Sequence, residues 1–501
     1  MRRRSLLAGL AAPLLAAADE PDSAPRVPSL RVSWQDRLDT LDPYRTRLRT
    51  GRVLAHEIFD CLIDRDPATF MMRPLLATHW RQENATTWLF RLRAGVWFHD
   101  GSEFGAEDVA STVRTVLADP EIAVPSTYAW LAGAEVVDDL TVRLRLLHPF
   151  TAALLFVASV LPIMPRGVSD PLIRAAMAQA PVGTGPYRLD KTQADDTLVL
   201  QAFETPVSRS PKGVPKIPRV LIRQRDSQAE AFADLQKAEA DFVGQLTPSQ
   251  IRRLTVDNSA TVLRSDTMRM VYLAFDAAGR SGPDFTAPAV RRAACHAIDA
   301  AAVTRAGGGT GVIYAPCVPT QFACDETIAV RYEYDPDKAR RLLAKAGHGG
   351  GLETELVASV RPEITRVVAE QLAAAGIVAR VTQLDSGAAL ARVAAGTAPL
   401  YLGSWSGAGI NDIAAFLPPF FDLGLMDMAR DEALAALVAE AAETVDAERR
   451  RGLFQRVITW VSEAALWLPL FLDEARYGIS RDLVFHPTPD ELPRFYRMEW
   501  R

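Results

Sequence analysis

The residues best suited to chemistry lie at the end of a strand predicted over residues 399–405. Trp405 closes this strand, and a loop of small residues, 406–409, follows it. A large aromatic ring beside small residues can stack on a ligand while the N–H and C=O groups of the loop contact it. A core position for Trp405 is the alternative. The pattern predicts a ligand contact formed by Ser404, Trp405, Ser406 and Gly407.

Arg361 is a second candidate, because it follows a strand predicted over residues 352–360. Parallel neighbours in an open α/β sheet bring their carboxyl ends to one crevice, so Arg361 is expected near Trp405. Its guanidinium could hold a ligand carboxylate through two parallel hydrogen bonds. An ordinary surface arginine is the alternative, since the chain uses Arg almost everywhere in place of Lys.

Catalytic motifs are weak in this sequence. The stretch 403–407 reads Gly-Ser-Trp-Ser-Gly, but a nucleophile elbow needs serine at its third position, where Trp405 stands. His99-Asp100 is explained more simply as a turn, and 307–311 lacks the last glycine of a dinucleotide-binding loop. Carboxylate pairs for glycoside hydrolysis remain an alternative, because their members can be far apart in the sequence. We expect no enzymatic activity and no cofactor.

Composition describes a folded soluble protein. A chain of 501 residues is too long for one ordinary core, so two or three domains are expected. The net charge of −5 gives no support to a nucleic-acid partner. The longest apolar run, 154–164, is cut short by Pro162 and Pro165 and does not reach the length of a membrane span. The histidines are scattered, so no metal site is expected.

The N-terminus has the plan of an export signal. Three arginines, 2–4, precede an apolar run from Leu6 to Ala17, and small residues at 16–18 suit cleavage. Residues 1–18 are therefore predicted to be removed, by the twin-arginine or the general route, and the mature chain to begin near Asp19. No cysteine follows the apolar run, which argues against a lipid anchor. The predicted location is the periplasm.

Four cysteines in an exported chain permit disulfides. Cys317 and Cys324 share one proline-containing loop and form the expected pair. Cys61 and Cys295 lie in apolar, helical contexts and are expected to be buried thiols.

The elements that would position these residues have clear local signals. Residues 88–92 alternate as in a strand with one buried face, a second short strand is predicted over 96–98, and Asp100-Gly101 predicts a tight turn. A helix opens at Glu107, with valines at helical spacing. Later strands alternate with helices, which predicts a largely parallel sheet for strands 270–275, 352–360, 377–382 and 399–405 and helices 290–299, 336–346 and 362–375.

Several of these stretches resemble solute-binding family 5, the periplasmic binding proteins of peptide and nickel ABC importers. The aromatic strand, the Gly-Val-Trp-Phe-His-Asp-Gly turn and the Ala-Glu-Asp-Val helix within 86–117 resemble its signature. Pro-Val-Gly-Thr-Gly-Pro-Tyr at 181–187 and the stretches 290–299 and 335–347 add to the resemblance. The chain departs from the family after residue 203, where a longer run ending in Asn-Pro-x-Tyr-Trp is usual.

The resemblance implies an α/β fold of the type II periplasmic binding class, with two lobes, a hinge and an inserted extra domain. It implies that residues 67–179 form the inserted domain and residues 266–472 form lobe II. Lobe I would be discontinuous, built from 27–66, 180–265 and 473–501. The implied function is capture of a peptide or peptide-like solute between the lobes by a monomer that delivers it to an ABC permease. A secreted hydrolase using the same cleft is the alternative.

The resemblance also bears on the site. The family holds its ligand at the strand end occupied here by Trp405, and Trp34 and Gln35 would face the cleft from the opposite lobe unless Trp34 is core. Peptide binders of the family carry an aspartate shortly after this tryptophan that pairs with the free amine. Here Ala408 stands in that region and Asp412 comes several residues late. A ligand that is less cationic, or no peptide at all, is therefore equally well supported.

Overall fold

The computed structural model describes residues 29–501 except 36, 47, 123–124, 194–196 and 205–209. The predicted signal at 1–18 and the predicted start near Asp19 lie outside the described residues. Within the described ranges, no helix is long and apolar enough to cross a bilayer.

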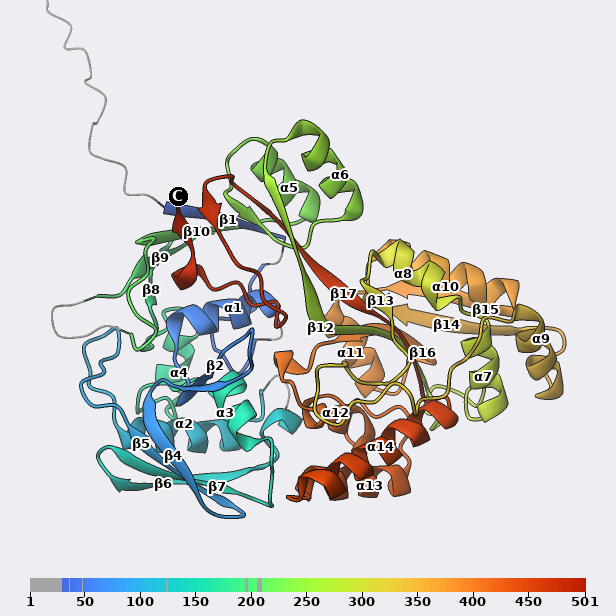
Figure 1. Ribbon diagram of the computed structural model, residues 1–501, viewed down its shortest axis with the longest axis horizontal. Helices are drawn as coiled ribbons and strands as arrows, with labels where there is room; N and C mark the ends of the chain where they lie inside the picture. Colours follow the sequence, from blue (N-terminus) through green and yellow to red (C-terminus); the bar gives the residue numbers. More distant parts are fainter. Residues whose placement is uncertain (1–28, 36, 47, 123–124, 194–196, 205–209) are drawn as a thin grey trace, which may run out of the picture.

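One mixed sheet runs through most of the molecule (Figure 1). Its strand order is β15-β14-β16-β12-β17-β11-β1-β10-β9-β8, with β13 added beside β17. We call the part built on β1, β8, β9, β10 and β11 lobe I and the part built on β13–β16 lobe II. The bounds are β1 Ser29–Trp34, β8 Tyr187–Thr192, β9 Leu198–Ala202, β10 Arg219–Gln224, β11 Phe242–Val243, β13 Gly311–Val312, β14 Leu352–Ala358, β15 Ile377–Gln383 and β16 Leu400–Trp405.

Two long antiparallel strands, β12 (Thr261–Phe275) and β17 (Trp467–Ile479), connect the lobes. The C-terminal end of β17 pairs with β11 of lobe I, whereas the C-terminal half of β12, from Met270 to Phe275, pairs with β16 of lobe II. Their ladder shifts register between Asp266 and Met270, where the strands pass from one lobe to the other. A bulge of this kind bends and twists a strand pair, so it suits a connection between two bodies.

Lobe II is less parallel than the sequence predicts. β14 pairs in parallel with β15 and β16, but β12 and β17 are antiparallel to their neighbours. The predicted helices form as α7 (Pro288–His296), α9 (Pro336–Lys345) and α10 (Pro362–Ala374). Asp335 caps α9 by accepting a hydrogen bond from the N–H of Lys338 at 2.7 Å, and Gly347 follows with φ +94°. The remaining helices of the lobe are α8 (Ala300–Gly307), α11 (Ser386–Ala394), α12 (Pro418–Phe421), α13 (Glu432–Glu443) and α14 (Ala447–Glu463).

A separate four-stranded antiparallel sheet leaves lobe I after α1 (Arg49–Ile58), with order β4-β5-β7-β6 (Figure 1). Phe90 and Leu92 of β5 are buried, and the valines of α2 pack on the same core. The strand predicted over 96–98 does not form; Trp97 makes only an isolated bridge to Glu103. The bounds here are β4 Ala77–Asn84, β5 Thr87–Leu92, β6 Leu131–Asp138, β7 Thr141–Leu146, α2 Ala106–Ala118, α3 Ala153–Val160 and α4 Pro171–Met177.

Further short elements complete the chain. Helices α5 and α6 cover one side of lobe I in Figure 1, and β2 and β3 form a small hairpin beside α1. The C-terminus returns to lobe I, near β1. Their bounds are β2 Ile63–Arg65, β3 Met72–Pro74, α5 Gln228–Gln236, α6 Pro248–Asp257, β18 Leu483–Val484 and β19 Glu499–Trp500, with short 3-10 turns η1 Pro125–Tyr128, η2 Gly407–Gly409, η3 Ile413–Ala415 and η4 Phe495–Arg497.

The glycine-rich crossing 181–187 packs directly on the end of α1. A Cβ on Gly183 would lie 2.0 Å from the carbonyl oxygen of Ile58, so only glycine allows this approach. The ring of His99 joins the same place: its Nδ1 accepts from the N–H of Gly183 at 3.3 Å and its Nε2–H donates to the carbonyl of Gly185 at 3.0 Å. Two motifs far apart in the sequence therefore form one joint between lobe I and the four-stranded sheet.

The structure pairs Cys317 with Cys324, the pairing expected from the sequence, and leaves Cys61 and Cys295 as buried free thiols. Burial raises the pKa of the Cys61 thiol to about 12, so it stays protonated and unreactive at neutral pH.

Candidate functional site

A cavity of about 320 Å³ lies between lobe II and the part of the chain that carries α1 and the four-stranded sheet. Side chains of α1, η1 and α3 form one wall. The opposite wall comes from the loop after β16, together with α12 and α13. The volume is at the lower end of the range for small-molecule sites, about 300–1,000 Å³. Position and size make this cavity the candidate site.

One wall of the cavity is aromatic. Trp130 and Phe150 stack with centroids 5.6 Å apart, and Phe156 meets Phe150 edge-on at 5.1 Å. Tyr128 lines the cavity beside them, with its hydroxyl donating to the carbonyl of Val160 at 2.9 Å. These rings support one another, so they present a preformed apolar surface to a ligand.

Trp405 faces the cavity from lobe II. Its ring is partly exposed and meets Phe420 at right angles, with centroids 5.2 Å apart. Its Nε1–H donates to the carbonyl of Ala415 at 3.3 Å. These contacts fix one edge of the indole and leave part of its surface open, which suits stacking on a ligand.

The loop after Trp405 has an unusual backbone. Gly407, Ala408 and Gly409 follow one another with φ of +52°, +57° and +68°, a left-handed run that glycine adopts at low cost. A Cβ on Gly409 would lie 2.6 Å from the Cβ of Asp490, so the loop can approach lobe I this closely only with glycine there. Gly407 and Ala408 line the cavity, and the loop forms its floor on the lobe II side.

Basic groups enter the cavity from lobe I. Arg52 of α1 is partly buried, and its Nη2 lies 3.5 Å from the carbonyl oxygen of Ala408 across the cleft. Burial lowers the pKa of the Arg52 guanidinium. Burial, followed by the nearby charge of Lys212, holds the pKa of His56 well below its usual value, so this imidazole is neutral at pH 7. Lys212 itself pairs with Asp60, Nζ to Oδ1 2.9 Å.

Acidic groups enter from lobe II. Asp422, after α12, and Glu443, at the end of α13, both line the cavity. Burial raises the pKa of Asp422, whose Oδ1 accepts from the N–H of Gly424 at 2.8 Å. Asp412 does not belong to this group, because it is buried and holds Arg450 through two hydrogen bonds of 2.6 and 2.9 Å.

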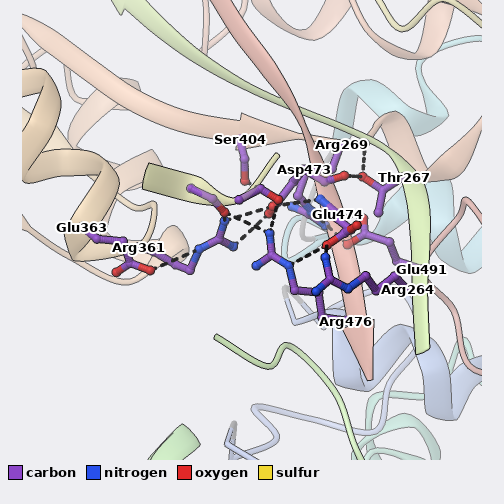
Figure 2. Close-up of polar contacts among 12 residues, drawn as sticks. Arg264, Thr267, Arg269, Arg361, Glu363, Ser404, Asp473, Glu474, Arg476 and Glu491 are labelled. Carbon is purple, nitrogen blue, oxygen red and sulfur yellow. Dashed lines mark hydrogen bonds and ion pairs between the residues drawn. The ribbon is translucent and has the colours of Figure 1, made fainter. Parts of the chain in front are cut away.

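Arg361 and Ser404 lie outside the cavity lining, in an ion-pair network beside the connecting strands (Figure 2). The guanidinium of Arg361 holds both carboxylate oxygens of Asp473 on β17, at 3.0 and 3.1 Å. The hydroxyl of Ser404 accepts from Nη1 of Arg269 at 3.2 Å, and Arg269 also pairs with Glu491 at 3.1 Å. In this conformation both predicted residues serve contacts within the protein.

Trp34, Gln35 and Ser406 also lie outside the cavity lining. Trp34 is 7 % exposed and stacks on Phe495 in the main core, which is the alternative that its sequence context left open. The side-chain amide of Gln35 donates to that of Gln245 at 3.1 Å, within lobe I. Of the residues predicted to contact ligand, the structure therefore places Trp405 and Gly407 on the cavity.

Arg52, His56, Asp422 and the aromatic wall were missed in the sequence. In the sequence, Trp130 and Phe150 cannot be told apart from aromatic residues of the core. Arg52 is one of several arginines between residues 45 and 52, so nothing marks it as a ligand contact. The described residues contain no group of three or more His, Cys, Asp or Glu side chains that could hold a metal ion. The groups that line the cavity offer a ligand aromatic rings, the guanidinium of Arg52, the carboxylates of Asp422 and Glu443, and the backbone of the loop after β16.

Comparison with known proteins agrees with this architecture. The glutathione-binding protein GsiB of Escherichia coli strain 536 is 26% identical over 481 residues, which cover 92% of each chain. The periplasmic binding protein DppA of Helicobacter pylori, solved with the peptide STSA, superposes with a TM-score of 0.84 at 21% identity, over 94% of this chain and 98% of that one. A dipeptide-binding protein of Pseudoalteromonas sp. SM9913, solved with Met-Leu, also gives 0.84, at 19% identity over 94% and 100%.

These solved structures have the two-lobed type II periplasmic binding fold that the sequence predicts. Residues 71–425 match the family profile described as bacterial extracellular solute-binding proteins, family 5 Middle. The chain therefore belongs to family 5 of the bacterial extracellular solute-binding proteins, the solute-binding components of ABC importers.

Proposed function

We propose that this protein captures a peptide or peptide-like solute in the cavity between its lobes and delivers it to the permease of an ABC importer. The cavity itself carries the proposal, because one wall comes from α1 and the aromatic rings and the other from Trp405 and its loop. A solute bound there contacts both sides of the cleft and stabilises the closed form. The names of the relatives, which cite glutathione, the peptide STSA and Met-Leu, support a peptide-like solute.

The domain division expected from the sequence completes the proposal. Residues 67–179 would form the inserted domain, 266–472 lobe II, and 27–66, 180–265 and 473–501 lobe I. The long strands β12 and β17 would act as the hinge, with their register shift as its flexible point. Residues 27 and 28 lie outside the described ranges.

Export to the periplasm through the signal at residues 1–18 belongs to the same proposal, with a mature, unanchored monomer beginning near Asp19. The disulfide between Cys317 and Cys324 supports an oxidising compartment. N-terminal sequencing of the protein from a periplasmic extract tests the cleavage site, and an intact Met1 in a cytosolic fraction would refute it.

A thermal-shift screen over peptides, opines, sugars and metal chelates tests the function. We expect a rise in melting temperature with one class of solute, and full recovery of that solute unchanged after incubation. Release of product from a peptide or glycoside would instead favour the secreted hydrolase. We prefer solute binding to hydrolysis because the relatives named above are binding proteins.

A further inference from the structure

Among the described residues that line the cavity, one cation, Arg52, has no carboxylate partner. Arg49, one turn before Arg52, pairs with Glu491. Lys212, on the same side of the cavity, pairs with Asp60 at 2.9 Å. No carboxylate of the described residues lies within 4.0 Å of the Arg52 guanidinium, and among these residues it has one polar contact, to the carbonyl oxygen of Ala408 at 3.5 Å.

A partly buried guanidinium without an anion is costly to keep, because burial removes water and nothing replaces it. The acids whose charges act on it, Asp490 and Glu491, are already engaged by Arg494 and Arg49. His56 does not compete for an anion, since its imidazole is neutral. Among the described residues that line the cavity, Arg52 is therefore the cation available to a ligand, and the carboxylates of Asp422 and Glu443 lie on the opposite wall.

We propose that the solute is an anion and that Arg52 binds its carboxylate or comparable oxyanion. This inference rests on the proposed function and names the class of solute. Guanidinium and carboxylate match as a bidentate pair, which would satisfy donors that Ala408 alone does not. The aromatic wall then takes the rest of the solute, an apolar or aromatic body joined to the charged group.

The position of Arg52 also ties recognition to closure. Its helix belongs to lobe I, whereas its contact, the Ala408 carbonyl, belongs to the left-handed loop of lobe II. An anion bound between them has its full set of contacts only when the loop lies against α1. Binding of the charged group therefore favours the closed conformation selectively, as a closing ligand must.

The test uses matched acids and amides as probes: N-acetyl-Ala-Phe and its C-terminal amide, N-acetylphenylalanine and its amide, and 3-phenylpropionate and its amide. Calorimetry should show an acid bound by the wild type at least tenfold more tightly than its amide, about 1.4 kcal/mol. Arg52→Met should remove this preference by weakening the acid alone. Equal binding of acid and amide, or unchanged acid binding by Arg52→Met, would overturn the inference.

Arg49→Met is the matched control, on the same helix but in an ion pair with Glu491. Without ligand, Arg49→Met should lower the melting temperature, whereas Arg52→Met should leave it unchanged or raise it. Equal losses for both variants would assign Arg52 a structural role and overturn the inference. Binding of an uncharged solute in the cavity would also overturn the inference of an anionic solute, but it would leave the proposed function standing. A failure of every solute class in the screen would instead count against the proposed function.

Discussion

Replacing Trp405 with alanine separates a ligand contact from a core residue. The indole lines the cavity, is partly exposed, and has two anchoring contacts, one to Phe420 and one to the carbonyl of Ala415. Trp467 provides the matched control, because it is 3 % exposed and its ring stacks on Tyr272 with centroids 3.9 Å apart.

The two variants should differ in which free energy they change. Loss of an aromatic anchor in a desolvated pocket costs about 2 kcal/mol or more of binding free energy, so Trp405→Ala should bind solute about thirtyfold more weakly. Its free energy of unfolding should fall by about 1–3 kcal/mol, the sum of one edge contact and one hydrogen bond. Trp467→Ala should cost about 3–5 kcal/mol of stability, as for a core aromatic.

Binding is measured by calorimetry with the solute that the screen identifies, and stability by urea unfolding of the ligand-free protein. Trp405→Phe, which keeps an aromatic face, should recover part of the affinity. The reasoning fails if Trp405→Ala unfolds as easily as Trp467→Ala while its affinity matches the wild type, since the ring would then be core.

Three further outcomes follow from the structure. Mass mapping of protein from the periplasm should find Cys317 and Cys324 bridged, and reduction should cost about 2–3 kcal/mol on the entropic model; two free thiols would contradict this. Burial lowers the pKa of His99 to about 4, below its unfolded value of about 6.5, so the folded protein should lose stability as the pH falls from about 6.5 towards 4. The variant His99→Gln should show a smaller fall in melting temperature over this pH range. An unchanged pH profile would show that His99 is not responsible. The sequence resemblance predicts no amine-pairing aspartate in the region of Ala408 and Gly409, so N-acetylation of the solute should change affinity less than tenfold. A larger loss would assign the amine to another acid, and Asp422 is the first to test.

Local chemistry made much of lobe II predictable. Asp335 and Gly347 mark the two ends of α9, and the structure uses both as the sequence indicates. The position of Trp405 on the cavity could also be predicted, because the end of its strand and the run of small residues after it are adjacent in the chain. These signals depend on residues that are close together in the chain, so they can be read from a single sequence.

The long-range pairings were not predictable in this way. Arg361 lies at the strand end that the sequence suggested, but Asp473, 112 residues away, holds its guanidinium. The contact between Arg52 and Ala408 spans 356 residues. The direction of the strands in the sheet also depends on long-range pairing. The antiparallel strands β12 and β17 lie among segments whose alternation of strands and helices is typical of a parallel sheet.

The loop after β16 joins these two kinds of information. Its glycines are visible in the sequence, but their reason appears only against lobe I, where Gly409 packs on Asp490 and Arg65 donates to the side-chain oxygen of Asn411 at 3.1 Å. Burial lowers the pKa of Arg65 to about 10, against the opposing attraction of Asp490. In this interface Arg65 lies between the side-chain oxygen of Asn411 and the ring of Phe70, whereas Arg52 contacts one carbonyl. If the solute is an anion, as proposed above, it would offset the cost of burying Arg52, and the loop that forms the floor of the cavity would make closure depend on what the cavity holds.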